Sequence, residues 1–580
     1  MKITFRKLML PLLLILILLS CKPVYGPEEK LNDISALMQL NENQRKAHMY
    51  GDAEMLAAEI ADTMISVSRG HIYINSNREI YDRFNNYFKN IEYIKWDDLE
   101  DPIINISDDG SYAEMIFKKI VQTRHKNEIG NWEKSSTLFS WSAYHKKLNG
   151  KWKIVSNTST RESLEFPTYD EFYSKGMMSF RNNKFDESLY YFERAYYIAP
   201  DNVTILYNFA KALTLNNHYE KAISVLQRLA EIRFIGLNNF ETDTLFQNLK
   251  QQKNYYALLE KIKENKKTVS RSEIAFSITE KDLIPEGIAF DSNTGTIYLS
   301  SAYKRKILSI DKNGIIKDFK SEVEDGLWST WGMEVDEMRN HLWVISSSTS
   351  QGMLVKKSIP QEQYGKSKIY KYDLTTGNLL KIYTYDAAGQ EHFFNDLTIS
   401  KSGDVYITES LTSKIYKISD EKDEIELLYQ ADPMFSFLNG LALNNDESKL
   451  FVASSEGISI LNLETLNWQL LQHPKNVSLE GIDGLTYYNG SLIAQQSGYP
   501  VNSVMLYFLD ESDYKITGSK ILESNNPFFD SATTGEISGE YYYYIANSQV
   551  RSAFEWKNTG PDKIKPLEQL KELVLLKVKL

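Results

Sequence analysis

A six-fold repeat in residues 271–580 constrains the fold more than any other feature of the chain. Each copy opens with a short motif, continues as a β run, turns at a polar cluster and gives a second β run. The six motifs begin at Glu286, Trp331, Asn395, Asn439, Asp483 and Thr534. Their intervals of 44 to 64 residues predict a six-bladed β-propeller. The run Leu573–Leu580 alternates as a strand. It is expected to close the ring by joining a blade at the other end of the repeat region.

The motif residues are predicted to meet at the mouth of the propeller channel, because the first strand of every blade lines that channel. Four of them are oxygen donors, namely Glu286, Asn395, Asn439 and Asp483. Carboxylates and amide carbonyls without His or Cys suit a hard cation, Ca²⁺ or Mg²⁺. The alternative is that Asn-Gly and Asp-Gly are turn residues. Matched positions in four of the six repeats favour the metal site.

The same motifs resemble those of the senescence-marker-protein/gluconolactonase (regucalcin-like) family, with paraoxonases more distant. The matching pieces are Pro285-Glu286-Gly287, Asn395-Asp396, Asn439-Gly440 and Asp483-Gly484. The resemblance implies a calcium-dependent lactonase or esterase whose metal is held by these four donors. The metal would polarise the ester carbonyl, and Asp483 or a neighbour would accept a proton.

Two departures from that family bear on the substrate. Phe393 stands where gluconolactonases carry Arg, and Ser346–Ser348 stand where paraoxonases carry a catalytic His. His392 is expected on the opposite face of its strand. Trp331, Phe393 and Thr534 are therefore predicted to line an apolar substrate pocket. A lactone or ester hydrolase and a non-catalytic binding or assembly protein with a structural metal both stay open.

The first twenty-one residues predict export and a lipid anchor. Lys2, Arg6 and Lys7 precede the apolar run Leu8–Leu19, which is too short to span a bilayer but suits a signal peptide. The run leads into Leu18-Leu19-Ser20-Cys21, which contains the only cysteine and resembles a bacterial lipobox. We expect a signal peptide at 1–20, acylated Cys21, a tether at 21–30 and a place in the cell envelope, on the outer membrane. The alternative is an ordinary secretory signal with a stray cysteine.

Charge excludes nucleic acid as a partner. The formal net charge is −11, and removal of residues 1–20, which carry three positive charges, gives −11 − 3 = −14. Nucleic-acid binding depends on clustered positive charge. The anchor is therefore the expected contact with membrane.

Residues 31–163 predict an α+β domain. Helical patterns cover Leu31–Tyr50 and Arg78–Phe88, and strand-like runs follow at Ile103–Ser107, Tyr112–Thr123, Leu138–Lys147 and Lys151–Ser156. Ala47-His48 with Gly51-Asp52, the stretch Ile106–Ala113 and the stretch Lys151–Val155 resemble the SnoaL-like, nuclear-transport-factor-like superfamily. That resemblance implies a cone-shaped pocket, for which His48 and Asp62 are candidate residues.

Residues 167–265 predict tetratricopeptide-like helical repeats. A 34-residue period relates the following two sets of small and aromatic residues: Phe172, Gly176, Phe185, Ser188, Phe192, Ala195 and Pro200 to Leu206, Ala210, Tyr219, Ala222, Leu226, Leu229 and Phe234. A third unit around Phe246–Ile262 is degenerate. The segment is either a groove for a protein partner or, as the small number of units favours, a helical spacer.

Overall fold

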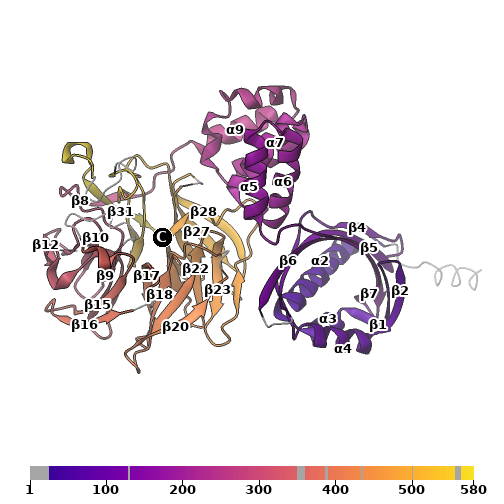
Figure 1. Ribbon diagram of the computed structural model, residues 1–580, viewed down its shortest axis with the longest axis horizontal. Coiled ribbons are helices and arrows are strands. Elements are labelled where there is room, and N and C mark those ends of the chain that lie inside the picture. Colours follow the sequence, from indigo (N-terminus) through magenta and orange to yellow (C-terminus); the bar gives the residue numbers. More distant parts are fainter. Residues whose placement is uncertain are drawn as a thin grey trace, which may run out of the picture. The chain divides into compact units, whose positions relative to one another are not determined.

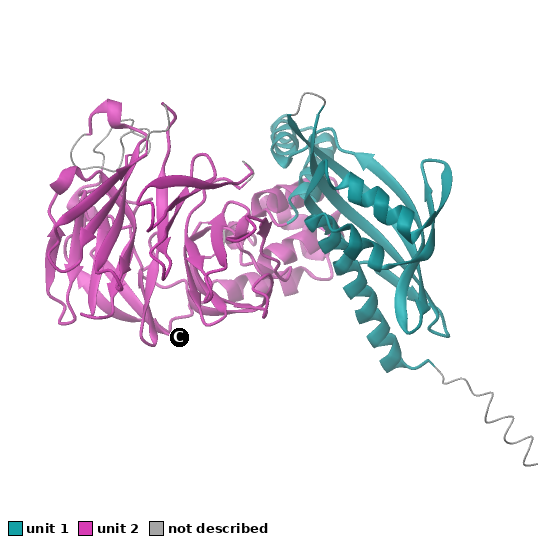
Figure 2. Ribbon diagram, turned by 90° about the horizontal axis from the view of Figure 1, so that it is seen from below, with its two compact units in different colours: residues 1–200 teal, residues 201–580 magenta. Residues whose placement is uncertain are grey.

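The computed structural model describes residues 25–127, 131–348, 359–385, 389–432, 435–498, 501–554 and 564–580. The chain divides at Pro200 into two compact units, the N-terminal unit and the C-terminal unit (Figure 2). The signal peptide and Cys21 lie outside the described residues. In the described part of the chain, no helix combines the length and apolarity needed to cross a membrane.

The N-terminal unit is a curved seven-stranded sheet backed by helices (Figure 1). Its strand order is β2-β1-β7-β6-β5-β3, with β4 paired to β5. The helices are α2 (Pro27–Tyr50), α3 (Ala53–Ala58) and α4 (Asn77–Tyr87). The strands are β1 (Ile60–Ser68), β2 (His71–Ser76), β3 (Ile91–Asp98), β4 (Ile103–Ile106), β5 (Tyr112–Lys126), β6 (Trp132–Leu148) and β7 (Lys151–Ser163).

Local capping sets the helix boundaries of this unit. Gly51 ends α2 in the left-handed region, at φ 65°, where glycine carries no steric cost. The Asp52 carboxylate then accepts the Met55 N–H and starts α3, and Ser76 and Glu79 form a capping box on α4. Helix α2 begins at Pro27, so the segment expected as a tether over 21–30 is helical at its end.

Five α-helices and two 3-10 helices follow along the chain. Helices α5 (Tyr169–Arg181) and α6 (Phe185–Ile198) belong to the N-terminal unit. The C-terminal unit begins with α7 (Val203–Leu215), α8 (Tyr219–Glu231), η1 (Ile235–Asn239), η2 (Thr244–Gln251) and α9 (Tyr255–Asn265). A Cβ on Gly176 would lie 2.7 Å from the Phe192 ring, which explains the small residue at that repeat position. The helical repeats are confirmed, and η2 replaces an α-helix in the third, degenerate unit.

The rest of the C-terminal unit is a propeller of six four-stranded sheets, which confirms the predicted fold. Blades 1 to 3 consist of β9 (Ile288–Asp291), β10 (Thr296–Ser301), β11 (Lys306–Ile310), β12 (Ile316–Lys320); β13 (Ser329–Asp336), β14 (His341–Ser347), β15 (Ser367–Asp373), β16 (Leu379–Thr384); and β17 (Phe394–Ile399), β18 (Val405–Glu409), β19 (Lys414–Ile418), β20 (Ile425–Gln430). Short 3-10 turns lie at η3 (Glu324–Gly326) and η4 (Gln361–Gln363).

Blades 4 to 6 complete the ring. They consist of β21 (Leu441–Leu443), β22 (Lys449–Ser454), β23 (Gly457–Asn462), β24 (Trp468–Leu470); β25 (Ile482–Tyr488), β26 (Ser491–Gln496), β27 (Ser503–Leu509), β28 (Ile516–Ser524); and β29 (Gly535–Ser538), β30 (Tyr541–Ile545), β31 (Leu573–Lys579), β8 (Glu273–Ile278). A 3-10 turn, η5 (Leu567–Gln569), precedes β31. The pairing of β31 with β8 joins the two ends of the repeat region within one blade. The predicted closure is confirmed.

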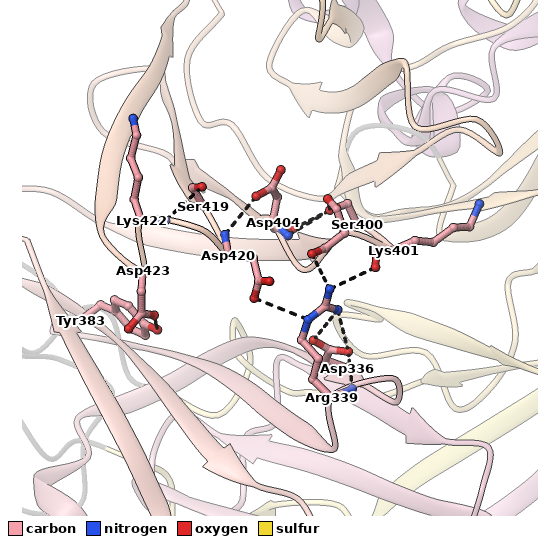
Figure 3. A network of polar contacts seen from close by, with 11 residues as sticks. Asp336, Arg339, Tyr383, Ser400, Lys401, Asp404, Ser419, Asp420, Lys422 and Asp423 are labelled. Carbon is pink, nitrogen blue, oxygen red and sulfur yellow. Dashed lines mark hydrogen bonds and ion pairs between the residues drawn. The ribbon is translucent and has the colours of Figure 1, made fainter.

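Polar contacts connect neighbouring blades. Arg339, in the turn between β13 and β14, pairs with Asp336 at 3.3 Å and reaches into blade 3 to pair with Asp420 at 3.5 Å (Figure 3). Its guanidinium also donates to the carbonyls of Lys401 and Ser402 in the turn between β17 and β18. Blades 2 and 3 are thereby held together at this end of the propeller.

Candidate metal centre in the propeller channel

Each motif residue lies at the start of the innermost strand of its blade, and three of them lie at irregularities in strand pairing. The register shifts between Thr330 and Met333, around Trp331. It shifts again between Phe394 and Leu397, around Asn395, and between Ile482 and Leu485, around Asp483. A bulge of this kind re-aims a side chain next to a functional site.

The glycines of the motifs keep neighbouring inner strands close together. A Cβ on Gly440 would lie 2.6 Å from the Asp483 carbonyl oxygen, and one on Gly484 would lie 2.7 Å from the Thr533 carbonyl oxygen. A Cβ on Gly287 would overlap the Trp331 carbonyl. None of these glycines adopts a positive φ. They are required for close approach of the blades and not for a left-handed backbone conformation.

The four predicted donors fall on blades 1, 3, 4 and 5, and hydrogen bonds fix the two amides. The Asn439 Nδ2 donates to Asp483 Oδ1 at 2.6 Å, across blades 4 and 5. The Asn395 Nδ2 donates to Ser410 Oγ at 3.0 Å. In both residues the amide nitrogen is engaged by protein, so the amide oxygen is the atom left to bind a cation.

Glu286 and Asp483 affect each other electrostatically. Burial, and then the nearby Asp483 carboxylate, raises the pKa of Glu286 well above its usual value. Burial also raises the pKa of Asp483, against the opposing effects of its Asn439 hydrogen bond and of Arg551. Two desolvated carboxylates beside amide oxygens fit a hard divalent cation, whose charge would favour their ionised forms.

Of the three residues predicted for a substrate pocket, Thr534 contacts a donor residue, and Trp331 and Phe393 contact each other. Thr534 donates its hydroxyl to the Glu286 carbonyl oxygen at 2.6 Å, which ties blade 6 to blade 1. Trp331 is buried, only 6% exposed, and its indole N–H donates to the Ser347 carbonyl oxygen at 3.2 Å. The half-buried Phe393 meets Trp331 edge to face, with ring centroids 4.9 Å apart. Trp331 is therefore a fixed wall behind Phe393 and not an exposed rim residue.

His392 belongs to a different environment. It is buried, at 3% exposed, and its ring packs against Tyr385 and Phe394. Its Nε2 lies 3.1 Å from the Tyr385 carbonyl oxygen. These neighbours differ from those of Phe393, as expected for adjacent residues of a strand.

Three further carboxylates of the channel were not singled out in the sequence. Glu334, Asp396 and Glu536 line a polar cavity of about 290 Å³ together with Thr534 and backbone of the inner strands. Burial, aided by Asp483 and Glu536, raises the pKa of Asp396 to about 7, and burial raises that of Glu536 to about 7. Burial and Glu536 also raise the pKa of Glu334. The available signal was an acidic residue one to three positions after a motif start in three repeats.

The donor set differs from a purely acidic or histidine site. Within the described ranges, no three His, Cys, Asp or Glu residues gather so as to hold a metal. The candidate centre has two carboxylates and two amides, so two of its four donors are neither acidic residues nor His or Cys. This composition matches the oxygen ligands that Ca²⁺ accepts in proteins.

The residues singled out in the N-terminal region are separated from one another. His48, on α2, lies on the wall of a cavity in the N-terminal unit and stacks on Trp96, with ring centroids 4.8 Å apart. Asp62, on β1, is exposed and does not line that cavity. The expectation that Asp62 is a pocket residue is wrong, because its strand position faces solvent.

A tetratricopeptide-repeat family model matches residues 179–233. A search of curated proteins finds no match. Among solved structures, the chain is similar to a gluconolactonase from Xanthomonas campestris at 14% identity and a TM-score of 0.36, over 53% of this chain and 91% of the other. It is similar to the calcium-binding protein regucalcin from Agrobacterium tumefaciens at 12% identity and a TM-score of 0.37, over 53% and 93%.

A further similarity covers a smaller share of the chain. A protein of unknown function from Mycobacterium tuberculosis matches at 13% identity and a TM-score of 0.20, over 24% of this chain and 79% of the other. At these identities and TM-scores, none of the solved structures transfers an activity to this chain. The C-terminal region is a six-bladed β-propeller by its own topology, and its function follows from the channel residues.

Proposed function

We propose that the propeller is a metal-dependent hydrolase of apolar lactones or esters, with Ca²⁺ or Mg²⁺ held by Glu286, Asn395, Asn439 and Asp483. The observation that carries this proposal is the pair of half-buried, desolvated carboxylates Glu286 and Asp483. Asn439 is hydrogen-bonded to Asp483, and Asn395 holds the equivalent motif position in blade 3. Two such anions in one desolvated channel favour a cation between them.

The chain's own residues supply the remaining chemistry. A bound divalent cation would polarise the ester carbonyl and lower the pKa of water. Asp483 accepts the proton of the attacking water, and its hydrogen bond from Asn439 orients the carboxylate. The Thr534 hydroxyl fixes the backbone of Glu286.

Phe393 determines the preferred substrate in this proposal. It lies against Trp331 and offers no hydrogen-bond donor to a sugar hydroxyl. A hydroxyl that loses water without gaining a partner costs about 1–3 kcal/mol. Gluconolactone is therefore expected to be a poor substrate, and an alkyl or aryl lactone a better one.

The test is kcat/KM of the purified protein for gluconolactone and for a panel of alkyl and aryl lactones and aryl esters. Turnover of the apolar substrates should require Ca²⁺, disappear on chelation and fall strongly in Asp483→Asn. Glu464→Gln, which removes the same charge from an exposed loop, should keep wild-type activity. Faster turnover of gluconolactone than of every apolar substrate would contradict the substrate assignment.

The second candidate is a non-catalytic binding or assembly protein whose propeller uses its metal structurally. The tetratricopeptide repeat at residues 179–233 favours it, because such repeats commonly hold protein partners and a simple lactonase needs none. Absence of turnover with every substrate, combined with Ca²⁺ binding that depends on Glu286, would establish this candidate over the first.

We also propose that the protein is a lipoprotein of the bacterial envelope, on the outer membrane, and that residues 31–163 form a SnoaL-like domain. The lipobox-like sequence ending at Cys21 supports the anchor. Labelled fatty acid should enter the wild-type protein and be absent from Cys21→Ser. Equal labelling of the two would contradict the anchor. Two or more acyl chains at Cys21 would hold the protein firmly on a membrane.

A further inference from the structure

The N-terminal unit contains a cavity that the propeller function does not use. It has a volume of about 560 Å³ and lies between the concave face of the sheet and helices α2, α3 and α4. Protein pockets of this size hold drug-sized molecules. Aromatic side chains make up much of its wall: Phe84, Tyr87, Tyr93, Trp96, Phe117, Phe139 and Trp141. Such a wall favours a ligand with a flat apolar body.

The charged groups on the cavity wall are all basic. Among the described residues that line it there are two Arg and three His, and no Asp or Glu. Arg83 on α4 and Arg161 on β7 are exposed, and neither forms an ion pair with a described residue. The guanidinium of Arg83 lies over the Phe84 ring at 5.2 Å. Planar guanidinium groups without an acidic partner are suited to a carboxylate.

The buried ammonium of this region is already neutralised. Lys119 is fully buried and pairs with Asp98 at 2.6 Å. Its ammonium lies 4.0 Å from the centroid of the Trp96 ring. Lys119 therefore supports the aromatic wall and adds no free charge to the cavity. An anionic ligand would be held by Arg83 and Arg161.

One fully buried polar side chain of the cavity wall keeps a ring nitrogen without a hydrogen-bond partner among the described residues. His145 on β6 is 1% exposed, lines the cavity, and its Nδ1 has no hydrogen-bond partner among the described residues. Buried polar side-chain atoms are normally hydrogen-bonded. His48, by contrast, uses its Nδ1 on the Gln44 carbonyl oxygen at 2.7 Å. His145 is therefore the inner group that remains for a ligand hydroxyl.

We propose that this cavity binds an aromatic monocarboxylate that carries a hydroxyl at its far end. The carboxylate pairs with Arg83 and Arg161, the ring lies between the aromatic side chains, and the hydroxyl bonds to His145. This site is independent of the propeller, and the proposal stands whether or not the propeller is an enzyme.

The first test compares three fluorescent probes on the full chain by titration: 6-hydroxy-2-naphthoate, its methyl ester and 2-naphthoate. The methyl ester retains the naphthalene ring and its hydroxyl but has no negative charge. The third probe, 2-naphthoate, retains the carboxylate but has no hydroxyl. The hydroxy acid should bind roughly tenfold more tightly than the ester, and also more tightly than 2-naphthoate. Equal binding of acid and ester, or no saturation by the acid below about 1 mM, would overturn the proposal.

The second test asks whether Arg83 and Arg161 bind the carboxylate of the probe. Arg83→Gln with Arg161→Gln should remove the advantage of the acid over the ester and leave ester affinity unchanged. Arg78→Gln is the matched control, since Arg78 lies on the same helix, outside the cavity wall, paired with Asp82. His145→Phe should abolish only the preference for the hydroxyl. Equal weakening of acid and ester in the double Arg variant, with an unchanged melting temperature, would also overturn the proposal.

Discussion

The titratable groups whose pKa is shifted by burial are of opposite type in the N-terminal cavity and in the propeller channel. In the N-terminal cavity the buried groups are bases, and burial lowers the pKa of His48 and of His145 to about 4. In the propeller channel they are acids, and burial raises the pKa of Asp396 and of Glu536 to about 7. Burial disfavours the charged form in both places, so the direction of the shift depends only on the type of group.

The difference predicts opposite pH responses. A base with a lowered folded-state pKa loses stability as pH falls through the range between the unfolded and folded values, here 6.5 to about 4. An acid with a raised folded-state pKa loses stability as pH rises, here from 3.8 for Asp396 or 4.5 for Glu536 to about 7. The N-terminal unit should therefore be weakest in acid, and the metal-free propeller should weaken toward neutral pH.

The largest expected effect concerns the ion pair beneath the N-terminal cavity. Asp98→Asn leaves the fully buried Lys119 ammonium unpaired and should cost about 3–5 kcal/mol of unfolding free energy. Lys119→Met should cost less, because Asp98 is 24% exposed and keeps its hydrogen bond from Asn41. Pulse proteolysis in urea with peptide mapping measures the N-terminal unit separately.

Asp82→Asn provides the matched control for this pair. Asp82 is half exposed on α4 and pairs with Arg78, so its loss should change stability by less than about 1 kcal/mol. A larger cost for Lys119→Met than for Asp98→Asn would show that the aromatic wall, and not the paired charge, sets the stability of this region.

The second prediction tests the acid lability of the N-terminal unit. A pKa that falls from 6.5 to about 4 at His145 corresponds to about 3 kcal/mol, lost as pH drops through that range. His145→Gln should remove this part of the loss. His71→Gln, at an exposed position on β2, should retain it. The comparison would be broken if the unit kept the same stability at pH 4 and pH 7 in the wild type.

The propeller and its donors could be predicted because their signal repeats. Six motifs at similar spacing define the blades, and equivalent positions of blades converge on the channel without knowledge of side-chain packing. The bulges around Trp331, Asn395 and Asp483 could not be predicted, because a bulge is defined by the pairing partner. The bulges around Trp331 and Asn395 span equivalent positions, yet Glu334 lies three residues after Trp331 and Asp396 one residue after Asn395, so the repeat does not mark these two carboxylates.

The N-terminal sheet was predicted less completely. The strands β5 to β7 contain the predicted runs Tyr112–Thr123, Leu138–Lys147 and Lys151–Ser156. The strands β1 to β3 and helix α3 were not predicted. Strand β2 is exposed at Ile72 and Ile74 and lacks the alternation of a half-buried strand. Strand β1 pairs in parallel with β7, a contact far along the chain that no local pattern records.

The third prediction is that Ca²⁺ reverses the order of the melting temperatures of the wild type and Glu286→Gln. Ca²⁺ at a hundredfold excess over Kd should stabilise the wild-type propeller by about 2.7 kcal/mol. Glu286→Gln removes one of two half-buried carboxylates whose ionised forms are disfavoured by desolvation and by each other, so without Ca²⁺ it should unfold at a higher temperature than the wild type. With Ca²⁺ the order should reverse, because the variant lacks a charged donor.

Thermal melts of the full chain in chelator and in Ca²⁺ measure this reversal. Glu464→Gln, the exposed control, should follow the wild type in both solutions. A wild-type melting temperature that is the same in Ca²⁺ and in chelator would show that the channel does not bind the cation. Its carboxyl groups would then be stabilised by protonation.

The smallest expected effect is that of Gly440→Ala. It tests whether the glycines of the channel motifs are needed for the close approach of the blades or for turn formation. In Gly440→Ala the new Cβ would lie 2.6 Å from the Asp483 carbonyl oxygen, so the inner strand of blade 4 or 5 must shift, at a cost of about 1–3 kcal/mol. Gly518→Ala, on β28, places its Cβ 3.6 Å from the Phe508 ring, an ordinary contact, and should change stability by about 0.5 kcal/mol or less. The shift in Gly440→Ala also moves Asp483 relative to Asn439, so Ca²⁺ should stabilise this variant less than it stabilises Gly518→Ala. Equal stability and equal Ca²⁺ response in the two variants would mean that the close approach of the blades does not position the donors.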